Sequence, residues 1–416
     1  MRDAFIIGTS STPFGKWPDR DYKDLTGQAF REVLSDSGLN DAAEIASAWF
    51  GNCGMWVDGQ GSVRGQVCLM PLIRAGVLPE RIPIINVEGG CATASIALHG
   101  ACKDVASGQM ELSLAIATEK TFHPGHPERT NALYQGGIDQ LNVDEWQAYY
   151  SAMGERAGKP FELAPNRTIF MDTYALQACY HMKKFGTTQR QIAYAAAKNH
   201  TIAQHNPLAQ YRSPMTVEQV LADKPVTYPL TRSMCAPIGD GAAAALVCSE
   251  GFLRTAPSAT QNRAVRIAAA VLTSGKYRDP DEPSLSHVAA SKAYRIAGIQ
   301  PSDIHVAEVH DATSFCEIYQ AEMLGFCAPG EGGPLVESGA TSLGGRIPIN
   351  LSGGLVSKGH PVGATGLSMI HELALQLRCE AGPRQSANAR WAMAENGGGV
   401  VGFDEAACAI TILERT

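Results

Sequence analysis

The sequence lacks the features of membrane-spanning, secreted and nucleic-acid-binding proteins. No apolar stretch is long enough to cross a bilayer, and the one that follows Arg2 and Asp3 is too short for a signal peptide. There is no run of basic residues and the net charge is −7, so binding to nucleic acid is not indicated. The last three residues, 414–416, are not a peroxisomal signal. We therefore expect no partnership with membranes or nucleic acids.

Metal sites and disulfides are not indicated either. The 11 cysteines include no Cys-x-x-Cys pair and no Cys/His cluster at the spacing of metal ligands. Cysteines without such patterns suit a reducing compartment, so we expect a cytoplasmic protein without a metal. What the chain does have is the composition of a globular enzyme. Its 416 residues are 45% hydrophobic and 18% charged, which is enough for two or three domains.

Cys91 is the strongest candidate for a reactive residue. A strand-like apolar run, Ile82 to Ile85, comes before it, Gly89 and Gly90 precede it directly, and small residues that suit a buried helix follow. A cysteine at such a junction lies near unpaired backbone N–H groups and the positive end of a helix dipole, which both favour the thiolate. The alternative is an inert buried cysteine, as most cysteines are.

A second segment, residues 350–366, favours the reactive interpretation because it repeats the pattern around Cys91. Both segments start with asparagine, contain Gly-Gly and run into a helix-like stretch, which here is Leu367 to Leu377. A β-rich stretch follows each of them, which indicates a duplicated domain. Two such halves would bring Cys91 and His360 to a common central site. His360 has no obvious packing role in its glycine-rich loop, so we interpret it as functional.

His310 is a third candidate. It follows a strand-like run, Ile304 to Val309, and precedes an amphipathic run, Phe315 to Phe326. Open α/β sheets place their ligands at the carboxyl ends of strands, where His310 is expected to lie. The alternative is a hydrogen-bonded structural histidine.

Four stretches together resemble the thiolase superfamily, and in particular its sterol carrier protein 2 thiolase-like branch, which includes enzymes of the acetyl-CoA acetyltransferase type. They are Gly-Gly-Cys-Ala-Thr-Ala-Ser at 89–95, His-Asp-Ala-Thr at 310–313, Gly-His-Pro at 359–361 and Glu-Asn-Gly-Gly-Gly at 395–399. The resemblance covers nearly the whole chain. It implies a duplicated α/β/α/β/α five-layer fold, with a loop domain inserted in the first half.

The resemblance also implies a chemistry and a role for each candidate. A thiolase cleaves or forms a carbon–carbon bond of a 3-ketoacyl-CoA through an acyl-cysteine, which would be Cys91, with His360 as its base. One oxyanion site would use His360 with His310, which replaces the asparagine of ordinary thiolases. The other would use the backbone N–H groups of Cys91 and Gly397. Acyl-CoA and coenzyme A would be substrates, with no cofactor bound permanently and the residues that bind coenzyme A unknown.

The resemblance extends to assembly. Thiolases form dimers or tetramers, so a homo-oligomer is implied. Some relatives in this branch act only with a small partner subunit that carries an OB-fold and a zinc ribbon. The resemblance leaves open whether this chain has such a partner.

One position departs from the family. Ordinary thiolases have a second catalytic cysteine in the last glycine-rich loop, where this chain has Glu395, and Ala312 stands where the branch often has another cysteine. Glu395 could carry the proton if burial raises its pKa, or it could be a solvated or salt-bridged glutamate. Cys316 is a weaker candidate that suits the helix core better. The rival functions are a retro-aldol lyase acting on acyl-CoA thioesters, and a non-catalytic acyl or lipid carrier or scaffold subunit.

The sequence texture suggests three regions. Residues 1–118 together with 227–263 are expected to form the N-terminal thiolase half, and residues 264–416 the C-terminal half. Residues 119–226 are rich in Gly, Pro, His, Asn and Tyr at first and then helix-like, so we interpret them as the inserted loop domain that covers the active site and shapes substrate choice. The irregular spacing of its histidines favours a polar loop over a metal site.

Overall fold

The computed structural model describes residues 2–165 and 167–416. The strands are β1 (Ala4–Ser11), β2 (Ser47–Gly51), β3 (Ile84–Val87), β4 (Leu112–Lys120), β5 (Pro225–Thr227), β6 (Leu230–Thr231), β7 (Asp240–Ser249), β8 (Val265–Ser274), β9 (Val306–Glu308), β10 (Trp391–Gly398) and β11 (Ala407–Arg415). The helices of the first half are α1 (Tyr22–Ser37), α2 (Arg64–Arg74), α3 (Thr93–Ser107), α4 (Pro127–Gln135), α5 (Val143–Ala157), α6 (Ile169–Phe185), α7 (Gln189–Ala203) and α8 (Val217–Ala222). Those that follow are α9 (Glu250–Thr255), α10 (Ser258–Arg263), α11 (Leu285–Ala297), α12 (Ser314–Met323), α13 (Gly332–Glu337), α14 (Gly354–Lys358) and α15 (Thr365–Arg378).

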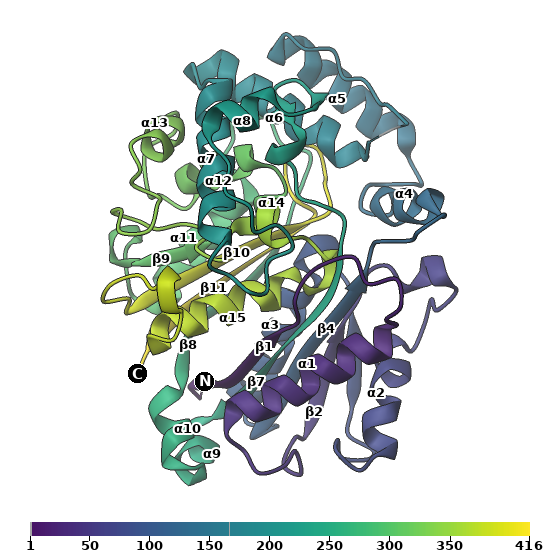
Figure 1. The fold of residues 1–416 in the computed structure, drawn as a ribbon, viewed down its shortest axis with the longest axis vertical. Coiled ribbons are helices and arrows are strands. Elements are labelled where there is room, and N and C mark those ends of the chain that lie inside the picture. The colour runs from purple at the N-terminus through teal and green to yellow at the C-terminus, as the bar shows by residue number, and fades with distance from the viewer. Residues whose placement is uncertain (1, 166) are drawn as a thin grey trace.

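A mixed sheet of nine strands, in the order β3-β2-β4-β7-β1-β8-β11-β10-β9, forms the framework (Figure 1). Its two halves meet where the first residues of β1 pair with the first residues of β8, Ala4 with Ile267 and Ile6 with Val265. The strands in the middle of each half are covered on both faces. They are therefore mostly apolar: in the fully buried β4 run from Leu112 to Glu119, Leu, Ala and Ile occupy five of the eight positions.

The strand order confirms the duplication predicted from the sequence. In the first half β4 pairs in parallel with β2 and antiparallel with β7, which pairs with β1. In the second half β10 pairs in parallel with β9 and antiparallel with β11, which pairs with β8. A bridge between Ala307 and Ile349 stands where the first half has the pairing of β2 with β3. The two segments read as repeats are thus equivalent in the sheet.

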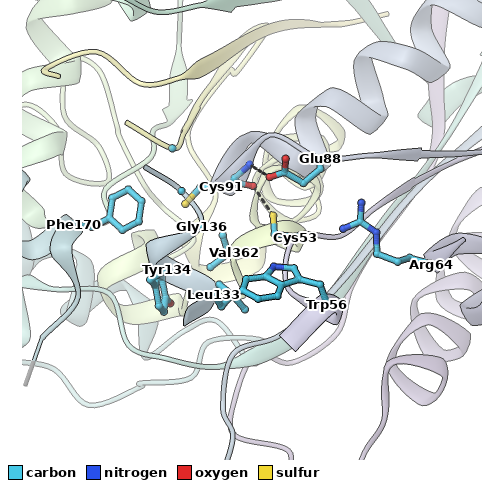
Figure 2. A pocket seen from close by; sticks show the side chains of 13 residues that line it. Cys53, Trp56, Arg64, Glu88, Cys91, Leu133, Tyr134, Gly136, Phe170 and Val362 are labelled. Carbon is cyan, nitrogen blue, oxygen red and sulfur yellow. Dashed lines mark hydrogen bonds between the residues drawn. The ribbon is translucent and has the colours of Figure 1, made fainter. Parts of the chain in front are cut away.

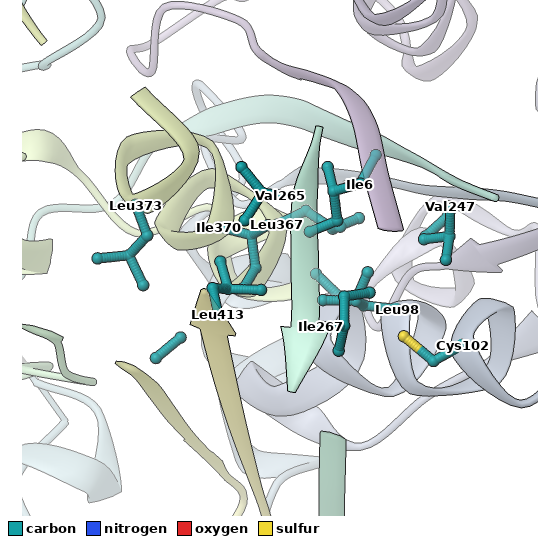
Figure 3. Packing of buried hydrophobic residues seen from close by; sticks show 14 of the residues in the cluster. Ile6, Leu98, Cys102, Val247, Val265, Ile267, Leu367, Ile370, Leu373 and Leu413 are labelled. Carbon is teal, nitrogen blue, oxygen red and sulfur yellow. The ribbon is translucent and has the colours of Figure 1, made fainter. Parts of the chain in front are cut away.

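The layers follow from three clusters of buried residues. The central cluster joins α3 and α15 to the inner faces of both half-sheets, with Leu98, Leu367 and Leu413 among its members (Figure 3). A second cluster packs α1 and α2 on the outer face of the first half, and a third packs α11 and α12 on the outer face of the second. Helix, half-sheet, helix pair, half-sheet and helix therefore alternate, which is the thiolase-like α/β arrangement expected.

Small residues explain why α3 lies at the centre. Its buried face is built from Ala94, Ala97, Gly100 and Ala101, which allow close contact with neighbouring elements on all sides. At Gly100 a Cβ atom would lie 2.3 Å from the ring of Trp49 on β2, so only glycine fits there. This packing fixes the N-terminus of α3, where Cys91 lies.

The segment between β4 and β7 holds helices α4 to α8, which occupy the upper part of Figure 1. The expected boundary at residue 119 falls inside β4, which continues to Lys120, and β7 starts at Asp240. The division of the chain into three regions stays a prediction. Within the described residues, no helix combines the length and apolarity that crossing a membrane requires.

Candidate active site

Cys91 lies in a tight turn between β3 and α3, as the sequence predicted. Gly90 has a φ angle of +57°, and a Cβ atom there would lie 2.6 Å from the nitrogen of Gly399. At Gly398 a Cβ atom would lie 2.1 Å from the carbonyl oxygen of Gly89. Glycines on both sides therefore let the end of β10 press against the Cys91 turn.

Two side chains from the second half meet Cys91. The Nε2 atom of His360 lies 3.2 Å from the sulfur of Cys91. The ring of His310 packs edge-on against that of His360, with 5.1 Å between the ring centroids. One ligand-type atom from each of the three residues lies within 4.8 Å of those of the others. The structure thus brings together the three residues that the sequence singled out from positions 91, 310 and 360.

The tautomer of His360 follows from its other ring nitrogen. Nδ1 lies 2.8 Å from the hydroxyl oxygen of Thr365, and that hydroxyl donates its own hydrogen to the carbonyl of Pro361 at 3.1 Å. Thr365 can therefore only accept from His360, so Nδ1 carries the proton. This leaves the lone pair of Nε2 facing the Cys91 thiol, which is the arrangement of a general base. Thr365 was not among the residues predicted from the sequence.

Burial changes the expected protonation of the thiol. We predicted that the turn and the helix N-terminus favour the thiolate, but burial raises the pKa of Cys91 to about 12. The N–H groups of Gly399 and of Cys91 itself act in the opposite direction and are outweighed. Cys91 therefore rests as a thiol and becomes nucleophilic when His360 takes its proton.

Both histidines are neutral at rest. Burial lowers the pKa of His310 to about 4 and that of His360 well below its usual range, and the neighbouring His310 and Lys358 lower the latter further. Among the described residues, the buried Nε2 of His310 has no hydrogen-bond partner. An unpaired polar atom beside a nucleophile is placed to bind a substrate oxygen.

The backbone N–H group of this loop that acts on the Cys91 thiol is that of Gly399, which lowers the thiol pKa. Gly397, which the resemblance implied as an oxyanion donor, lies inside β10, paired with Cys408, and its α-carbon faces Glu405. The role of Gly397 stays a prediction. The strand β10 continues to Gly398, so Gly399 is the first residue after it.

Glu395 is fully buried rather than solvated. Its carboxylate accepts a hydrogen bond of 3.0 Å from the main-chain N–H of His310. Burial, and then the nearby Glu405, raise the pKa of Glu395, so its protonated form is favoured. Its neighbour Asn396 faces the opposite side of the strand and bonds Ser95 on α3. Glu395 is not among the residues that line the cavity over Cys91.

A cavity of about 210 Å³ lies over Cys91 (Figure 2). Leu133, Tyr134 and Phe170 form one wall of it, and they come from the inserted segment. The remaining lining residues include Cys53, Trp56, Arg64, Glu88 and Val362. The insertion therefore contributes apolar and aromatic side chains to the place where a substrate would meet Cys91.

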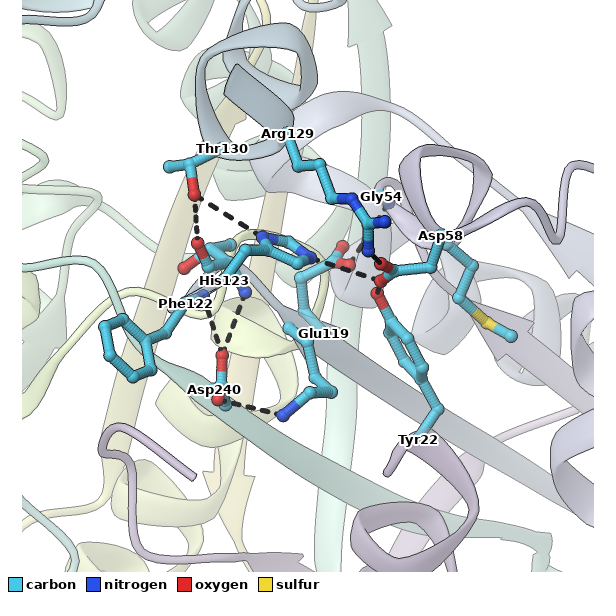
Figure 4. A network of polar contacts seen from close by, with 12 residues as sticks. Tyr22, Gly54, Asp58, Glu119, Phe122, His123, Arg129, Thr130 and Asp240 are labelled. Carbon is cyan, nitrogen blue, oxygen red and sulfur yellow. Dashed lines mark hydrogen bonds and ion pairs between the residues drawn. The ribbon is translucent and has the colours of Figure 1, made fainter. Parts of the chain in front are cut away.

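Two carboxylates, the buried Glu119 and the partly exposed Asp58, form the polar contacts shown in Figure 4. The Glu119 carboxylate accepts hydrogen bonds from the backbone N–H groups of Cys53 and Gly54, and burial raises its pKa to about 7. Asp58 accepts from Arg129 at 2.9 Å and lies 3.1 Å from Nε2 of His123. His123 is thus part of a polar network.

Cys316 has the position expected of a packing residue. It is 5% exposed, lies in α12 and contacts the Thr313 hydroxyl at 3.4 Å. Burial raises its pKa to about 12. It does not line the cavity over Cys91.

The chain matches known proteins over most of its length. Residues 4–228 match the family described as the thiolase N-terminal domain, and residues 272–414 match the thiolase C-terminal domain-like family. The chain belongs to the thiolase superfamily. It is 34% identical over 409 residues to an acetyl-CoA acetyltransferase of Methanothermobacter thermautotrophicus, covering 97% of this chain and 98% of that one. It is 33% identical to human sterol carrier protein 2, covering 98% of this chain and 73% of that protein.

Solved structures share the fold of this thiolase-family chain. The Ltp2-ChsH2(DUF35) aldolase superposes with a TM-score of 0.76 at 22% identity, covering 98% of this chain and 97% of that one. Human mitochondrial 3-ketoacyl-CoA thiolase in complex with CoA superposes with a TM-score of 0.69 at 18% identity, covering 100% of this chain and 98% of that one. At these identities the likeness is one of fold.

Proposed function

We propose that this protein is a thiolase-type acyltransferase that cleaves a 3-ketoacyl-CoA, or forms one by Claisen condensation, through an acyl group on Cys91. The observation that carries the proposal is the His360 lone pair directed at the Cys91 thiol, with the tautomer held by Thr365. An inert buried cysteine has no need of an oriented neutral histidine at 3.2 Å. The membership of the thiolase superfamily supports acyl-CoA and coenzyme A as substrates.

The first half-reaction uses these groups in a fixed order. The Cys91 thiol gives its proton to His360, and the sulfur attacks the 3-keto carbon. The bond between C2 and C3 breaks, its electron pair stays on C2, and C2 takes up a proton supplied by Glu395. An acyl-CoA leaves, and the acyl group remains on Cys91. The second half-reaction reverses the proton transfers: the CoA thiol attacks the acyl group, its proton returns to Glu395, and His360 returns the other proton to Cys91.

Two groups of donors suit the negative charge that develops along this path. The N–H groups of Cys91 and Gly399 converge on the sulfur, so they would bind the oxygen of the carbonyl under attack. The unpaired Nε2 of His310, together with protonated His360, would bind the thioester oxygen of the leaving enolate. We therefore assign to Gly399 the role that the resemblance implied for Gly397.

Intact mass spectrometry tests the proposal. After mixing with a panel of acyl-CoAs and 3-ketoacyl-CoAs, the protein should gain the mass of one acyl group, and the Cys91→Ala variant should gain none. Release of the acyl group by added coenzyme A should regenerate the starting mass. Acylation elsewhere, or full turnover by Cys91→Ala, would contradict the mechanism. A retro-aldol lyase would cleave a carbon–carbon bond of an acyl-CoA thioester without forming an acyl group on Cys91. A carrier or scaffold would bind the thioester and leave it unchanged.

The protein is also proposed to act as an oligomer. No strand of the described chain pairs with the outer edge of β3, and an exposed strand edge is open to a further strand. A small partner subunit is a further part of the proposal, and the DUF35 component named with the Ltp2 aldolase supports it. Turnover measured with and without purified candidate partners, and light scattering of the isolated chain, test these two points separately.

A further inference from the structure

Glu119 is a buried carboxyl group that the mechanism does not use. It lies near the end of β4, is fully buried and is not among the residues that line the cavity over Cys91. The three residues after β2, Asn52 to Gly54, bond to it, and Figure 4 shows its carboxylate directed towards Gly54. Cys53 also lines the cavity. It is therefore the residue through which Glu119 can act on the site.

Both oxygens of the Glu119 carboxylate accept hydrogen bonds. Oε2 accepts from the backbone N–H of Cys53 at 2.9 Å, and Oε1 accepts from the backbone N–H of Gly54 at 3.1 Å and from the side-chain amide of Asn52 at 3.0 Å. The amide oxygen of Asn52 accepts from the N–H of Met55 at 2.9 Å, so its nitrogen is the atom that faces Glu119. A position that faces only donors suits a carboxylate, because a protonated carboxyl or an amide would set one hydrogen against another.

The Cys53 side chain continues these contacts to the turn on which Cys91 lies. Its thiol donates to the carbonyl oxygen of Gly90 at 2.9 Å, as Figure 2 shows. Because this bond uses the only hydrogen of the thiol, the Thr93 hydroxyl, which lies 3.0 Å from the sulfur, is the donor in the second contact. The same hydroxyl oxygen accepts from the N–H of Gly89 at 2.9 Å. The turn is thus bonded to Cys53 both before and after the nucleophile.

The loop that carries His360 packs against the same carboxylate. A Cβ atom at Gly363 would lie 2.5 Å from Oε2 of Glu119 and 3.3 Å from the nitrogen of Cys53. A side chain at this position would have to displace the carboxylate from its donor, so the close approach requires a glycine. Glu119 thus lies where the segments of the nucleophile and of its base meet, and there Nε2 of His360 is 3.2 Å from the sulfur of Cys91.

The cations near Glu119 are paired with other carboxylates. Lys120 pairs with Asp240 at 3.0 Å, and Arg129 pairs with Asp58 at 2.9 Å. Burial raises the pKa of Glu119 to about 7, and its backbone donors act in the opposite direction. The charge of Glu119 therefore changes near neutral pH.

The neighbouring titratable groups keep their charge in that range. His360, on the loop that packs against Glu119, is neutral because burial lowers its pKa. Burial raises the pKa of the phenols and thiols around Glu119, so they stay uncharged at neutral pH; these groups are Tyr22, Cys53, Cys68, Cys91 and Tyr134. His123 contacts Asp58 at 3.1 Å and belongs to the neighbouring carboxylate.

We propose that the carboxylate of Glu119 is a positioning group, which holds the end of β2 so that Cys53 keeps the Cys91 turn at hydrogen-bonding distance from His360. The inference rests on the proposed function. When Glu119 takes up a proton, one of its oxygens stops accepting, and the N–H of Cys53 or of Gly54 loses its partner. The turn then loses its support, and the Cys91 thiol is no longer held against Nε2 of His360. Acylation of Cys91 therefore requires ionised Glu119.

Acylation of Cys91 by acetyl-CoA, followed against pH by intact mass, tests this role. In the wild type the rate should fall as pH falls below about 7, because Glu119 then becomes protonated. In Glu119→Gln that fall should be absent, and the rate at alkaline pH should be lower by about tenfold, the worth of one hydrogen bond. The half-saturating concentration of acetyl-CoA should stay within a few-fold, since Glu119 does not line the cavity. Glu395 is proposed to act in its protonated form, so its titration has the opposite sign.

Variants of two neighbouring residues separate positioning from general stability. Asp58→Asn is the matched control, because Asp58 is the other carboxylate of the network and contacts His123 and Arg129. This variant should keep both the acylation rate and its fall at acid pH. Cys53→Ala removes the thiol donor and should slow acylation by about tenfold, whereas Cys53→Ser keeps a donor and should stay within a few-fold of wild type. Both Cys53 variants should keep the fall at acid pH, since Glu119 is intact.

The outcomes separate this inference from the proposed function. If Glu119→Gln is acylated at the wild-type rate with the wild-type dependence on pH, Glu119 does not position the turn and the proposed function stands. If Glu119→Gln does not fold, the Cys53 variants decide, and equal rates in Cys53→Ala and Cys53→Ser would overturn the inference.

If no acyl-CoA acylates the wild type, the proposed function fails and a measurement without substrate tests the inference. Alkylation of Cys91 by iodoacetamide also uses His360 as the proton acceptor, and peptide mapping distinguishes it from alkylation of Cys53. Glu119→Gln and Cys53→Ala should each slow alkylation of Cys91 near neutral pH by about tenfold, and Asp58→Asn should not. Equal rates in all of these proteins would overturn the inference.

Discussion

Nδ1 of His360 donates a hydrogen bond of 2.8 Å to the Thr365 hydroxyl, and this bond decides which nitrogen faces Cys91. Thr365 is the first residue of α15, so the helix that belongs to the central layer also orients the base. The nucleophile comes from the corresponding helix of the other half, α3, whose first turn follows Cys91. The duplicated fold therefore positions the nucleophile with α3 and the base with α15, the corresponding helix of the other half.

Removal of the Thr365 hydroxyl should impair the base. We expect Thr365→Val to lower kcat by about tenfold, the worth of one hydrogen bond of about 1–1.5 kcal/mol, because Nε2 is then no longer held as the acceptor. Thr365→Ser keeps the hydroxyl and should stay within a few-fold of wild type. Steady-state kinetics of both variants check this. An equal loss of kcat in the two variants would show that Thr365 acts through packing and not through the tautomer of His360.

Alkylation of Cys91 should depend on His360 and on pH. Because burial raises the thiol pKa to about 12, we expect slow reaction with iodoacetamide near pH 7 and a rate that rises steadily towards alkaline pH. His360→Ala should slow the reaction at neutral pH by about tenfold or more, since the proton acceptor is lost. His310→Ala should leave it nearly unchanged, because His310 is assigned to oxyanion binding. Peptide mapping of the label gives the rates, and fast alkylation in His360→Ala would contradict the assignment.

Glu395→Gln should separate acyl transfer to Cys91 from carbon–carbon cleavage or condensation. Transfer of an acyl group from an acyl-CoA to Cys91 involves no carbon acid and should survive. Carbon–carbon cleavage or condensation should fall by about two to four orders of magnitude, the usual worth of a positioned acid–base group. Intact mass measures the first and product formation the second. If overall turnover stays within a few-fold of wild type, Glu395 only holds the N–H of His310.

The same substitution should change how stability depends on pH. The pKa of Glu395 in the folded protein is raised above the unfolded value, which is near 4.5. Its stabilising contribution is therefore complete below that value and is lost as pH rises through the folded pKa. Urea denaturation should show Glu395→Gln gaining stability relative to wild type as pH rises across the neutral range. Glu111→Gln is the control: a hydrogen bond from Ser249 lowers the pKa of Glu111, so its contribution is lost only as pH falls into the acid range, and the difference from wild type should stay constant across the neutral range.

The contact between β10 and the Cys91 turn should tolerate no side chain at Gly398. A Cβ atom there would lie 2.4 Å from the nitrogen of Ala92 and 2.8 Å from that of Cys91, and backbone atoms cannot move aside alone. Gly398→Ala should therefore cost about 1–3 kcal/mol of stability and displace the backbone donors, with a loss of acylation rate. Gly61→Ala is the control, because a Cβ atom there meets nothing within 4 Å. Thermal unfolding and acylation kinetics check both variants.

The sequence was sufficient for the parts of the site that depend on local structure. Cys91 lies where a strand, a glycine-rich turn and a helix follow one another, and His360 lies in the glycine-rich turn that leads into α15; both orders are visible along the chain. The repeat of that order predicted two equivalent halves, and the pairings of β4 and β10 agree with it. His310 was found for the same reason, since it follows a strand directly.

Tertiary structure decided the protonation states and the donors, because these depend on residues far apart in the chain. The turn and the helix N-terminus next to Cys91 favour the thiolate. Its burial under residues of the insertion and the second half nevertheless raises its pKa to about 12. Which glycine N–H acts on the Cys91 thiol depends on how far β10 continues, and pairing with β11 determines this. The effect of Glu405 on the pKa of Glu395 likewise arises only because the fold brings the segment before β11 against the end of β10. Short-range pattern fixes which residues stand at a turn, and desolvation and long-range packing fix what charge they carry there.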